Sequence, residues 1–246
     1  LKMSVVFNSI LDNDFYKFTM QCAVVKLFPD ARVKYEFINR GKHSFPEGFD
    51  DVLRKAINEM AKLQLTKAEK EFLKKNCPYL NLPYLDFLEG YHYDPSEVKI
   101  NQIGNDLEVI VEGLWYRTIL WEVPLLSLIS ELYYKMNGME RQTDEEITRK
   151  TLGKAKNLIE LKVNFAEFGT RRRHSYKVHD VVMKALTQDS NSYFIGSSNV
   201  HFSEISYTRS STFNTVMANI NSTSGDPLLY MQGMGGPGAG IKLNGA

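Results

Sequence analysis

The chain has 246 residues, of which 43% are hydrophobic and 24% charged, and its formal net charge is +1. This length can bury a substantial core in one large domain or two smaller ones. The near-neutral charge excludes a chain that binds polyanions over its whole surface. Cys22 and Cys77 lack the spacing of a zinc site and are too few for a disulfide framework. With no signal peptide and no long apolar run, we expect a cytoplasmic protein without a membrane partner.

The first 160 residues show periodicities typical of an α+β domain. Helices are predicted over residues 12–28, 50–63, 66–75, 121–138 and 143–161, and strands over 32–37 and within 98–113. Capping boxes at Thr66 and Thr143 mark two of the helix starts, and Asp12 or Asp14 can cap the first helix.

Turn residues divide this part of the chain further. Gly104-Asn105 lies between two alternating runs and predicts a hairpin of the II′ kind within residues 98–113. The stretch that contains Pro78 and Pro83 is predicted to be a loop. We therefore expect antiparallel pairing before residue 160.

The pattern changes near residue 160. A strand over 161–169, a helix over 175–186 and a strand over 192–200 follow each other with short connections. This order predicts a βαβ unit with parallel strands. Residues 203–246 hold seven of the 16 glycines and show no periodicity, so they form an unassigned tail.

A basic run stands at the end of the first of these parallel strands, where residues 168–173 read Phe-Gly-Thr-Arg-Arg-Arg. Ligands of α/β proteins bind beyond the carboxyl ends of parallel strands, and arginine offers a planar fork to a carboxylate or phosphate. Gly169 permits an unusual backbone angle or a close approach, and the helix starting near Ser175 offers free N–H groups. The run predicts an anion site with an aromatic wall. A solvated basic turn paired with surface acids and a nucleic-acid patch are the alternatives.

Two other segments carry residues suited to a binding site. Residues 196–198 read Gly-Ser-Ser at the end of the next strand, where small side chains and hydroxyl donors can close around a ligand. An ordinary strand-to-loop turn explains them equally well. Residues 11–21 place two aspartates, Tyr16 and Lys17 at a helix start, and capping with amphipathicity is their simpler interpretation.

Taken together, "DNDFYKFTMQ", "EFGTRRRHS" and "FIGSSNV", in this order and spacing, resemble the nicotinate phosphoribosyltransferase family of NAD salvage. "LWEVPLLSLISELYY" is similar to the helix between the domains of that family, and the resemblance covers about residues 8–202. It implies an enzyme that makes nicotinate mononucleotide and pyrophosphate from nicotinate and phosphoribosyl pyrophosphate. ATP hydrolysis through a transient phosphohistidine and Mg²⁺ are implied as well.

The resemblance also implies a fold and an assembly. The fold would be an α+β N-terminal domain (1–160) followed by an irregular α/β barrel that is incomplete here. Residues 161–202 would begin the barrel and carry the base-binding motifs. A homodimer with shared active sites is expected.

Site residues follow from matching the motifs. Phe168 would stack on one face of the pyridine ring, and Tyr16 of the facing subunit on the other. Arg171 would contact the nicotinate carboxylate or a phosphate, and Ser197 matches a position that is usually Thr. The expected substrate-binding residues are Tyr16, Phe168, Gly169, Thr170, Arg171, Arg172, Ser197 and Ser198, with Asp14 and Lys17 in support. No catalytic side chain and no metal ligand is assigned.

Part of the family pattern is missing. The phosphohistidine follows the "GSSNV" strand in a "GT-x-A-H-E" context, and His201 does not match it. Residues 203–246 are too few to complete a barrel, so we expect the 246-residue chain not to complete catalysis alone. The alternatives are a nicotinamide- or quinolinate-specific phosphoribosyltransferase and a truncated, non-catalytic nicotinate-binding protein. No nucleic-acid partner is expected.

Overall fold

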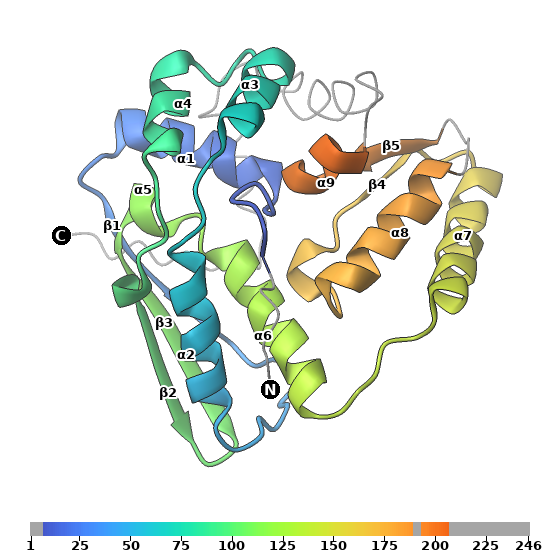
Figure 1. The fold of residues 1–246 in the computed structure, drawn as a ribbon, viewed down its shortest axis with the longest axis horizontal. Helices are drawn as coiled ribbons and strands as arrows, with labels where there is room; N and C mark the ends of the chain where they lie inside the picture. The colour runs from blue at the N-terminus through green and yellow to red at the C-terminus, as the bar shows by residue number, and fades with distance from the viewer. Residues whose placement is uncertain (1–6, 189–192, 207–246) are drawn as a thin grey trace.

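The computed structural model of the protein describes residues 7–188 and 193–206 (Figure 1). Its first part contains the elements α1 (Phe15–Leu27), β1 (Arg32–Glu36), α2 (Phe49–Met60), α3 (Lys67–Asn76), α4 (Leu82–Glu89), η1 (Pro95–Glu97), β2 (Val98–Ile103), β3 (Asp106–Leu114), α5 (Trp115–Thr118) and α6 (Glu122–Met136). Its second part contains α7 (Asp144–Glu160), β4 (Phe165–Glu167), η2 (Thr170–Arg172), α8 (Tyr176–Gln188), β5 (Phe194–Ser197) and α9 (Val200–Ser206).

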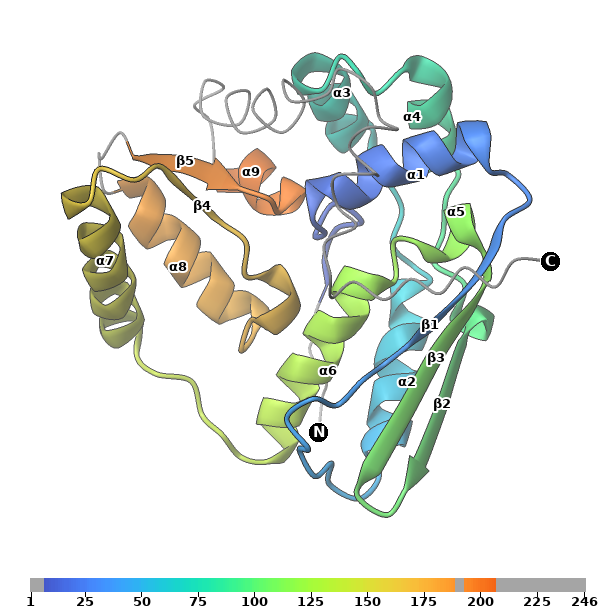
Figure 2. The same cartoon turned by 180° about the vertical axis from the view of Figure 1, so that it is seen from behind.

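The first part is built on an antiparallel sheet in the order β1-β3-β2. Burial alternates along β3, where Leu107, Val109 and Val111 point into the core. Helix α2 packs against this sheet, and α6 packs against α2 (Figure 2). At the tip of the β2–β3 hairpin, Gly104 has a φ of +57°, which a II′ turn requires at its first central residue. The predicted hairpin is confirmed.

The two predicted capping boxes are also confirmed. The hydroxyls of Thr66 and Thr143 accept the N–H groups of Glu69 and Glu146, and each glutamate bonds back to the backbone of its threonine. The first helix differs from the prediction in one respect. Asp14 occupies the N-cap position of α1, but its carboxyl group makes no capping hydrogen bond because it turns toward Ser198.

The prediction of a loop around Pro78 and Pro83 was wrong in its second half. Asn81 caps helix α4 by accepting the N–H of Tyr84 at 3.0 Å, and Pro83 lies in the first turn. A proline costs nothing there because the first N–H groups of a helix have no partner within the helix. The short helix α5 was not predicted either.

The second part contains the predicted βαβ unit, since β4 and β5 pair in parallel with α8 between them. Both strands are shorter than the predicted 161–169 and 192–200. The chain leaves β4 after Glu167, whose carboxylate accepts the N–H of Gly169 and bends the backbone into η2. The described residues mix α and β structure and form no closed barrel. Of the unassigned tail, 203–206 belong to α9 and the rest lies outside the described residues.

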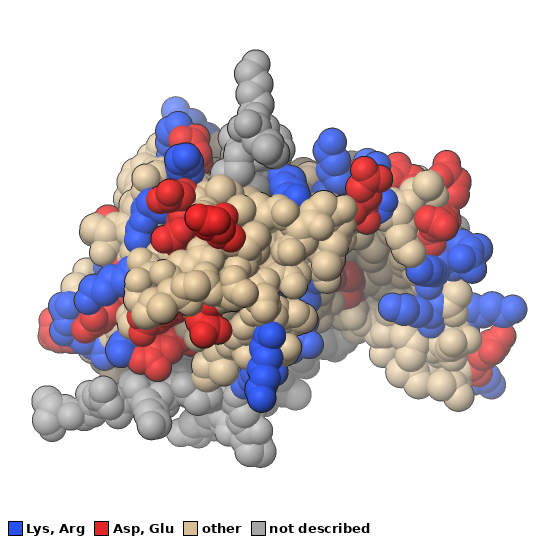
Figure 3. All heavy atoms as spheres, turned by 90° about the horizontal axis from the view of Figure 1, so that it is seen from below, with Lys and Arg blue, Asp and Glu red and all other residues tan. Residues whose placement is uncertain are grey.

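Lys and Arg side chains alternate with Asp and Glu over the face shown in Figure 3, and no single sign of charge dominates it. This face offers no support for a nucleic-acid patch. Within the described ranges, no helix combines the length and apolar character needed to span a membrane.

Candidate functional site

The three motifs of the sequence meet because the start of the chain is bonded to the end of β5. Phe15 N–H donates to the Ser198 carbonyl at 2.7 Å, and Val200 N–H donates to the Asn13 carbonyl at 3.1 Å. Asp14 and Asn199 form an isolated antiparallel bridge between these bonds. The first turn of α1 therefore lies against the carboxyl ends of the two parallel strands, where the sequence predicts a ligand site.

Tyr16 and Phe168 face each other at this junction. Their ring centroids are 6.1 Å apart and the ring planes differ by 14°. Tyr16 is 7% exposed and Phe168 50% exposed. The Tyr16 ring is therefore held by its surroundings, whereas the Phe168 ring is open to solvent. Within one chain the two rings already face each other, because the backbone pairing just described brings α1 to the strand ends of its own chain. A contribution of Tyr16 from a facing subunit stays a prediction.

The separation of these rings sets what can enter between them. Stacked carbon atoms lie about 3.5–4.0 Å apart, so a third flat ring needs its two neighbours roughly 7–8 Å apart. The observed 6.1 Å is short of that distance. Because Phe168 is half exposed, a small outward movement of its side chain would open the space.

The three arginines of the basic run have three different environments. Arg171 Nη1 lies 3.1 Å from Glu122 Oε1, and its side chain is 39% exposed. Arg172 is exposed, and the ion pairs found between described residues do not include it. The guanidinium of Arg173 is buried and binds both carboxylate oxygens of Asp12 at 2.8 Å. The run is therefore neither one anion site nor one solvated turn.

Arg171 is connected to the ring pair through two side chains. The Glu122 carboxylate that it contacts also pairs with Lys17, and the Lys17 ammonium lies 5.0 Å from the centroid of the Tyr16 ring. Burial would raise the pKa of Glu122, but the charges of Lys17 and Arg171 outweigh it and lower that pKa. Glu122 therefore stays ionised between two cations, close to the rings.

Helix α6 holds the turn that carries the arginines. Ser127 Oγ donates to the Thr170 carbonyl at 2.6 Å, and Ser130 Oγ donates to the Arg173 carbonyl at 2.9 Å. Glu131 on the same helix accepts the N–H of Tyr176 at 3.0 Å. The last contact corrects the expectation that the start of α8 offers its N–H groups to an outside anion, because an internal carboxylate already occupies that position.

Glu167 organises the two strand ends, and the sequence analysis did not single it out. Ser197 Oγ donates to Glu167 Oε2 at 2.6 Å, and His179 Nε2 lies 3.0 Å from the same oxygen without the alignment of a hydrogen bond. Burial would raise the pKa of this carboxyl group, but His179 and Ser197 outweigh burial and lower it. The sequence signal that could have identified Glu167 is its position as an acidic residue directly before Phe168.

The same carboxylate explains why a glycine follows Phe168. Gly169 has a φ of −99°, so it needs no glycine-specific backbone angle. A Cβ atom built there would lie 2.8 Å from Glu167 Oε1. The sequence analysis expected Gly169 to provide either an unusual backbone angle or room for a close approach, and the first expectation is wrong. The close approach is one made by a side chain of the protein.

Asp14 is the second carboxyl group beside the rings. Ser198 Oγ donates to its Oδ1 at 2.8 Å, whereas its Oδ2 is buried without a hydrogen-bond partner. Burial raises the pKa of Asp14, and the Arg171 charge offsets that effect only in part. Ser197 and Ser198 thus donate their hydroxyl groups to carboxyl groups of the protein, and Oδ2 of Asp14 is left without a hydrogen bond.

Asn199 links Asp12 to Thr170 by hydrogen bonds, and the sequence analysis did not single out this residue either. Its side-chain N–H₂ group donates to Asp12 Oδ1 at 2.8 Å and to Thr170 Oγ1 at 3.0 Å. The expected binding residue Thr170 is fully buried, with its hydroxyl facing Asn199 and its carbonyl facing Ser127. In the structure, Thr170 therefore connects the turn after β4 to Ser127 of α6 and to Asn199.

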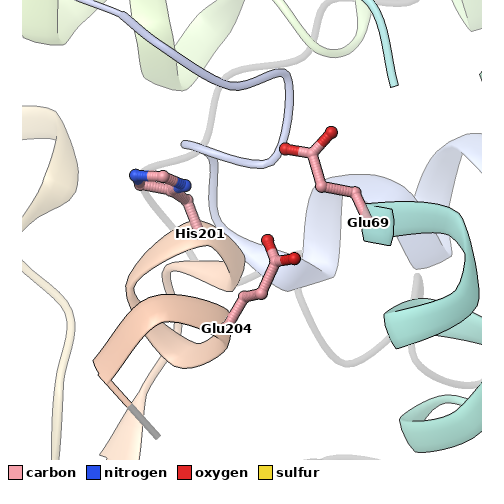
Figure 4. A group of neighbouring side chains, drawn as sticks. All are labelled: Glu69, His201 and Glu204. Carbon is pink, nitrogen blue, oxygen red and sulfur yellow. The ribbon is translucent and has the colours of Figure 1, made fainter. Parts of the chain in front are cut away.

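A second group of ligand-type side chains lies between α3 and α9 (Figure 4). Glu69 from α3 faces His201 and Glu204 from α9, and the donor atoms of the three lie within 4.8 Å of one another. Burial lowers the pKa of His201 and, together with the nearby Glu69 charge, raises that of Glu204. No prediction from the sequence included this group, because Glu69 is far from the other two residues in the chain.

Comparison with known proteins gives the same family for both parts of the chain. The nicotinate phosphoribosyltransferase N-terminal domain model matches residues 11–130, and the nicotinate phosphoribosyltransferase family model matches residues 163–226. The chain belongs to the nicotinate phosphoribosyltransferase family. The resemblance of the three sequence motifs to that family is confirmed.

Individual relatives of this family match over about four fifths of the chain. A nicotinate phosphoribosyltransferase from Chromohalobacter salexigens is 56% identical over 194 residues, covering 79% of this chain and 50% of the relative. One from Desulforapulum autotrophicum is 46% identical, covering 80% and 51%. The crystal structure of the Porphyromonas gingivalis enzyme superposes with a TM-score of 0.78 at 41% identity, covering 81% and 51%. The chain thus spans about half the length of the curated relatives it matches.

Proposed function

We propose that this protein is a nicotinate phosphoribosyltransferase, which forms nicotinate mononucleotide and pyrophosphate from nicotinate and phosphoribosyl pyrophosphate. The observation that carries the proposal is the pair of facing rings, Tyr16 and Phe168, connected through Lys17 and Glu122 to the partly exposed guanidinium of Arg171. Aromatic faces suit a flat pyridine ring, and a guanidinium suits the carboxylate attached to that ring. The names of the matched relatives support the same activity.

In this reaction the pyridine nitrogen attacks C1 of the ribose with its lone pair. The bond between C1 and pyrophosphate breaks, and its electrons leave with the pyrophosphate. The nitrogen carries no proton that must be removed, so no general base is required and no side chain is proposed as one. The protein must instead align the ring with C1 and stabilise the charges that develop.

The ring pair supplies more than alignment. As the new N–C bond forms, the pyridine ring becomes cationic, and the faces of Tyr16 and Phe168 attract a cation more strongly than a neutral ring. Arg171 holds the carboxylate of nicotinate and thereby fixes the rotation of the ring between the two walls. Contacts that strengthen with the developing charge favour the transition state over the bound substrate.

Mg²⁺ and ATP are proposed as cofactor and second nucleotide substrate. Near the rings, Glu122 and Glu167 are already engaged by basic or hydroxyl side chains, whereas Oδ2 of Asp14 has no hydrogen-bond partner. One carboxylate oxygen fits a Mg²⁺ ion that is otherwise held by substrate phosphates and water. Such an ion would neutralise charge on the departing pyrophosphate. The position of a phosphohistidine stays open.

We also propose the organisation implied by the family. An α+β domain (1–160) would be followed by an irregular α/β barrel that begins with residues 161–202, leaving 203–246 unassigned. The parallel pairing of β4 and β5 supports a barrel beginning. A homodimer in the cytoplasm is proposed, and the free thiols of Cys22 and Cys77 support a reducing compartment.

Side-by-side turnover tests the proposal. Nicotinate, nicotinamide and quinolinate would each be supplied with phosphoribosyl pyrophosphate, Mg²⁺ and ATP, and mononucleotide formation would be followed by chromatography. We expect nicotinate to be preferred over the other two bases, and the 246-residue chain to bind nicotinate without normal turnover. Preference for another base would assign the sibling activity. Nicotinate binding that ignores phosphoribosyl pyrophosphate and ATP would instead favour a non-catalytic binding protein.

A further inference from the structure

Glu69, His201 and Glu204 face one another across a space between α3 and α9 (Figure 4). Glu69 projects from α3 in the first part of the protein, and the other two project from successive turns of α9. Figure 4 shows one edge of the imidazole and both carboxyl groups turned toward the same space. One nitrogen and two carboxylates from separate elements thus converge.

The histidine presents a ring nitrogen without a hydrogen-bond partner to this space. His201 is 9% exposed, and its Nε2 lies 3.0 Å from the Tyr176 hydroxyl. Its Nδ1 is buried and has no hydrogen-bond partner. When Nε2 carries the proton and donates it to the Tyr176 oxygen, Nδ1 is left as an acceptor that faces two further acceptors. Metal-binding histidines are typically oriented in this way, with the second ring nitrogen donating to an oxygen.

The two carboxylates are placed differently. Glu69 is 7% exposed and is held by Thr66 N–H at 2.7 Å and by the Ser9 hydroxyl. Glu204 is only partly buried and can rotate toward it. The salt bridges between described residues include neither glutamate, so no described lysine or arginine lies within ion-pair distance of the two carboxylates. Two carboxylates and an unprotonated nitrogen that face each other repel unless a cation lies between them.

We propose that Glu69, His201 and Glu204 form a binding site for a divalent transition-metal ion, with Zn²⁺ as the preferred ion. His201 Nδ1 and one oxygen of each glutamate are the three protein ligands, and water completes the coordination. An imidazole ligand favours Zn²⁺ over Mg²⁺, which prefers oxygen ligands alone. The bound ion connects α3 with α9 and so joins the two parts of the chain behind the strand ends that carry Ser197 and Ser198.

Equilibrium dialysis with Zn²⁺ alone, quantified by elemental analysis, tests the site. We expect about one ion per chain in the unmodified protein. His201→Gln and Glu204→Gln should each raise the Kd for Zn²⁺ by about tenfold or more, because each removes one of three ligands. His92→Gln and Glu145→Gln change exposed residues elsewhere and should leave the Kd unchanged.

Tyr176→Phe separates a metal site from a general loss of folding. This change keeps the ring and removes only the oxygen that receives the His201 N–H group, so it should weaken Zn²⁺ binding severalfold while the circular dichroism spectrum is retained. At the same concentration, Zn²⁺ should also raise the melting temperature of the unmodified protein more than that of Glu204→Gln. Stoichiometry near zero, or equal Kd values for the unmodified protein and the His201→Gln and Glu204→Gln variants, would overturn the proposal.

Discussion

Arg173 and Asp12 form a buried ion pair in which Nη1 and Nη2 bind Oδ1 and Oδ2, both at 2.8 Å. The pair joins the basic run to the segment before α1. The third arginine of the run therefore acts in the fold, whereas the first, Arg171, is partly exposed beside Glu122.

Asp12→Asn should lower the free energy of unfolding by about 3–5 kcal/mol, because the change leaves the Arg173 charge buried without its partner. Urea unfolding at neutral pH measures this loss. Arg172→Ala is the control, and its effect should stay within about 0.5 kcal/mol because that residue is exposed. Equal effects of the two changes would show that the buried pair contributes little.

The same pair predicts an acid dependence. Burial alone would raise the pKa of Asp12, but Arg173 outweighs it and holds that pKa below the ordinary 3.8. A depressed pKa stabilises the folded state above the ordinary value, and this contribution is lost as pH falls through the folded pKa. Below about pH 4, the unmodified protein should therefore lose stability more steeply than Asp12→Asn. Parallel pH profiles would contradict this assignment.

Asp14→Asn should have the opposite effect on stability. The raised pKa of Asp14 means that the folded state disfavours its charge, so Asp14 costs stability as pH rises above the ordinary value of 3.8. The amide keeps the oxygen that Ser198 needs and removes the charge. We expect a higher melting temperature near pH 7 and lower turnover by the full-length protein. Asp30→Asn, an exposed change, should alter neither quantity.

The sequence predicted the elements better than it predicted the contacts between them. Capping boxes and the Gly104 turn depend on neighbouring residues, so local patterns were sufficient for both. Part of the loop predicted around Pro78 and Pro83 is helical, because Asn81 and Pro83 suit a helix start as well as they suit a turn.

The candidate site was predicted only in part, for a physical reason. Tyr16 and Phe168 face each other, and Arg171 is linked to Tyr16 through Glu122 and Lys17. Their role in binding substrate stays a prediction. The partners of these residues could not be predicted, because Glu122 and Asp12 are brought to the site by tertiary packing. Ion pairs between distant residues leave no periodic signal, so the division of the three arginines required the structure.

Phe168→Ala should weaken nicotinate binding by about 1 kcal/mol or more, because it removes one stacking face. The side chain is 50% exposed, so the melting temperature should change little. Val163→Ala, another exposed apolar change, is the control and should affect neither property. Titration calorimetry with nicotinate measures the difference. Unchanged affinity would exclude Phe168 as a wall of the base site.

Ser197→Ala should lower the free energy of unfolding by about 1–3 kcal/mol, because Glu167 and the Asn199 N–H group each lose a buried partner. Ser197→Thr keeps the hydroxyl and adds a methyl group, so its stability should lie much closer to that of the unmodified protein. Urea unfolding of both variants gives the comparison. Equal losses in the two variants would mean that packing, and not the hydroxyl, determines the effect.

The central claim is that Arg171 recognises the carboxylate of a pyridine base held at Tyr16 and Phe168. Calorimetric titration of the unmodified protein and Arg171→Ala with nicotinate, and then with uncharged nicotinamide, tests it most directly. We predict that Arg171→Ala weakens nicotinate binding by about 1.5–3 kcal/mol, as for a charged hydrogen bond, and leaves nicotinamide binding nearly unchanged. Nicotinate binding of equal strength in both proteins, or an equal loss for both ligands, would contradict the claim.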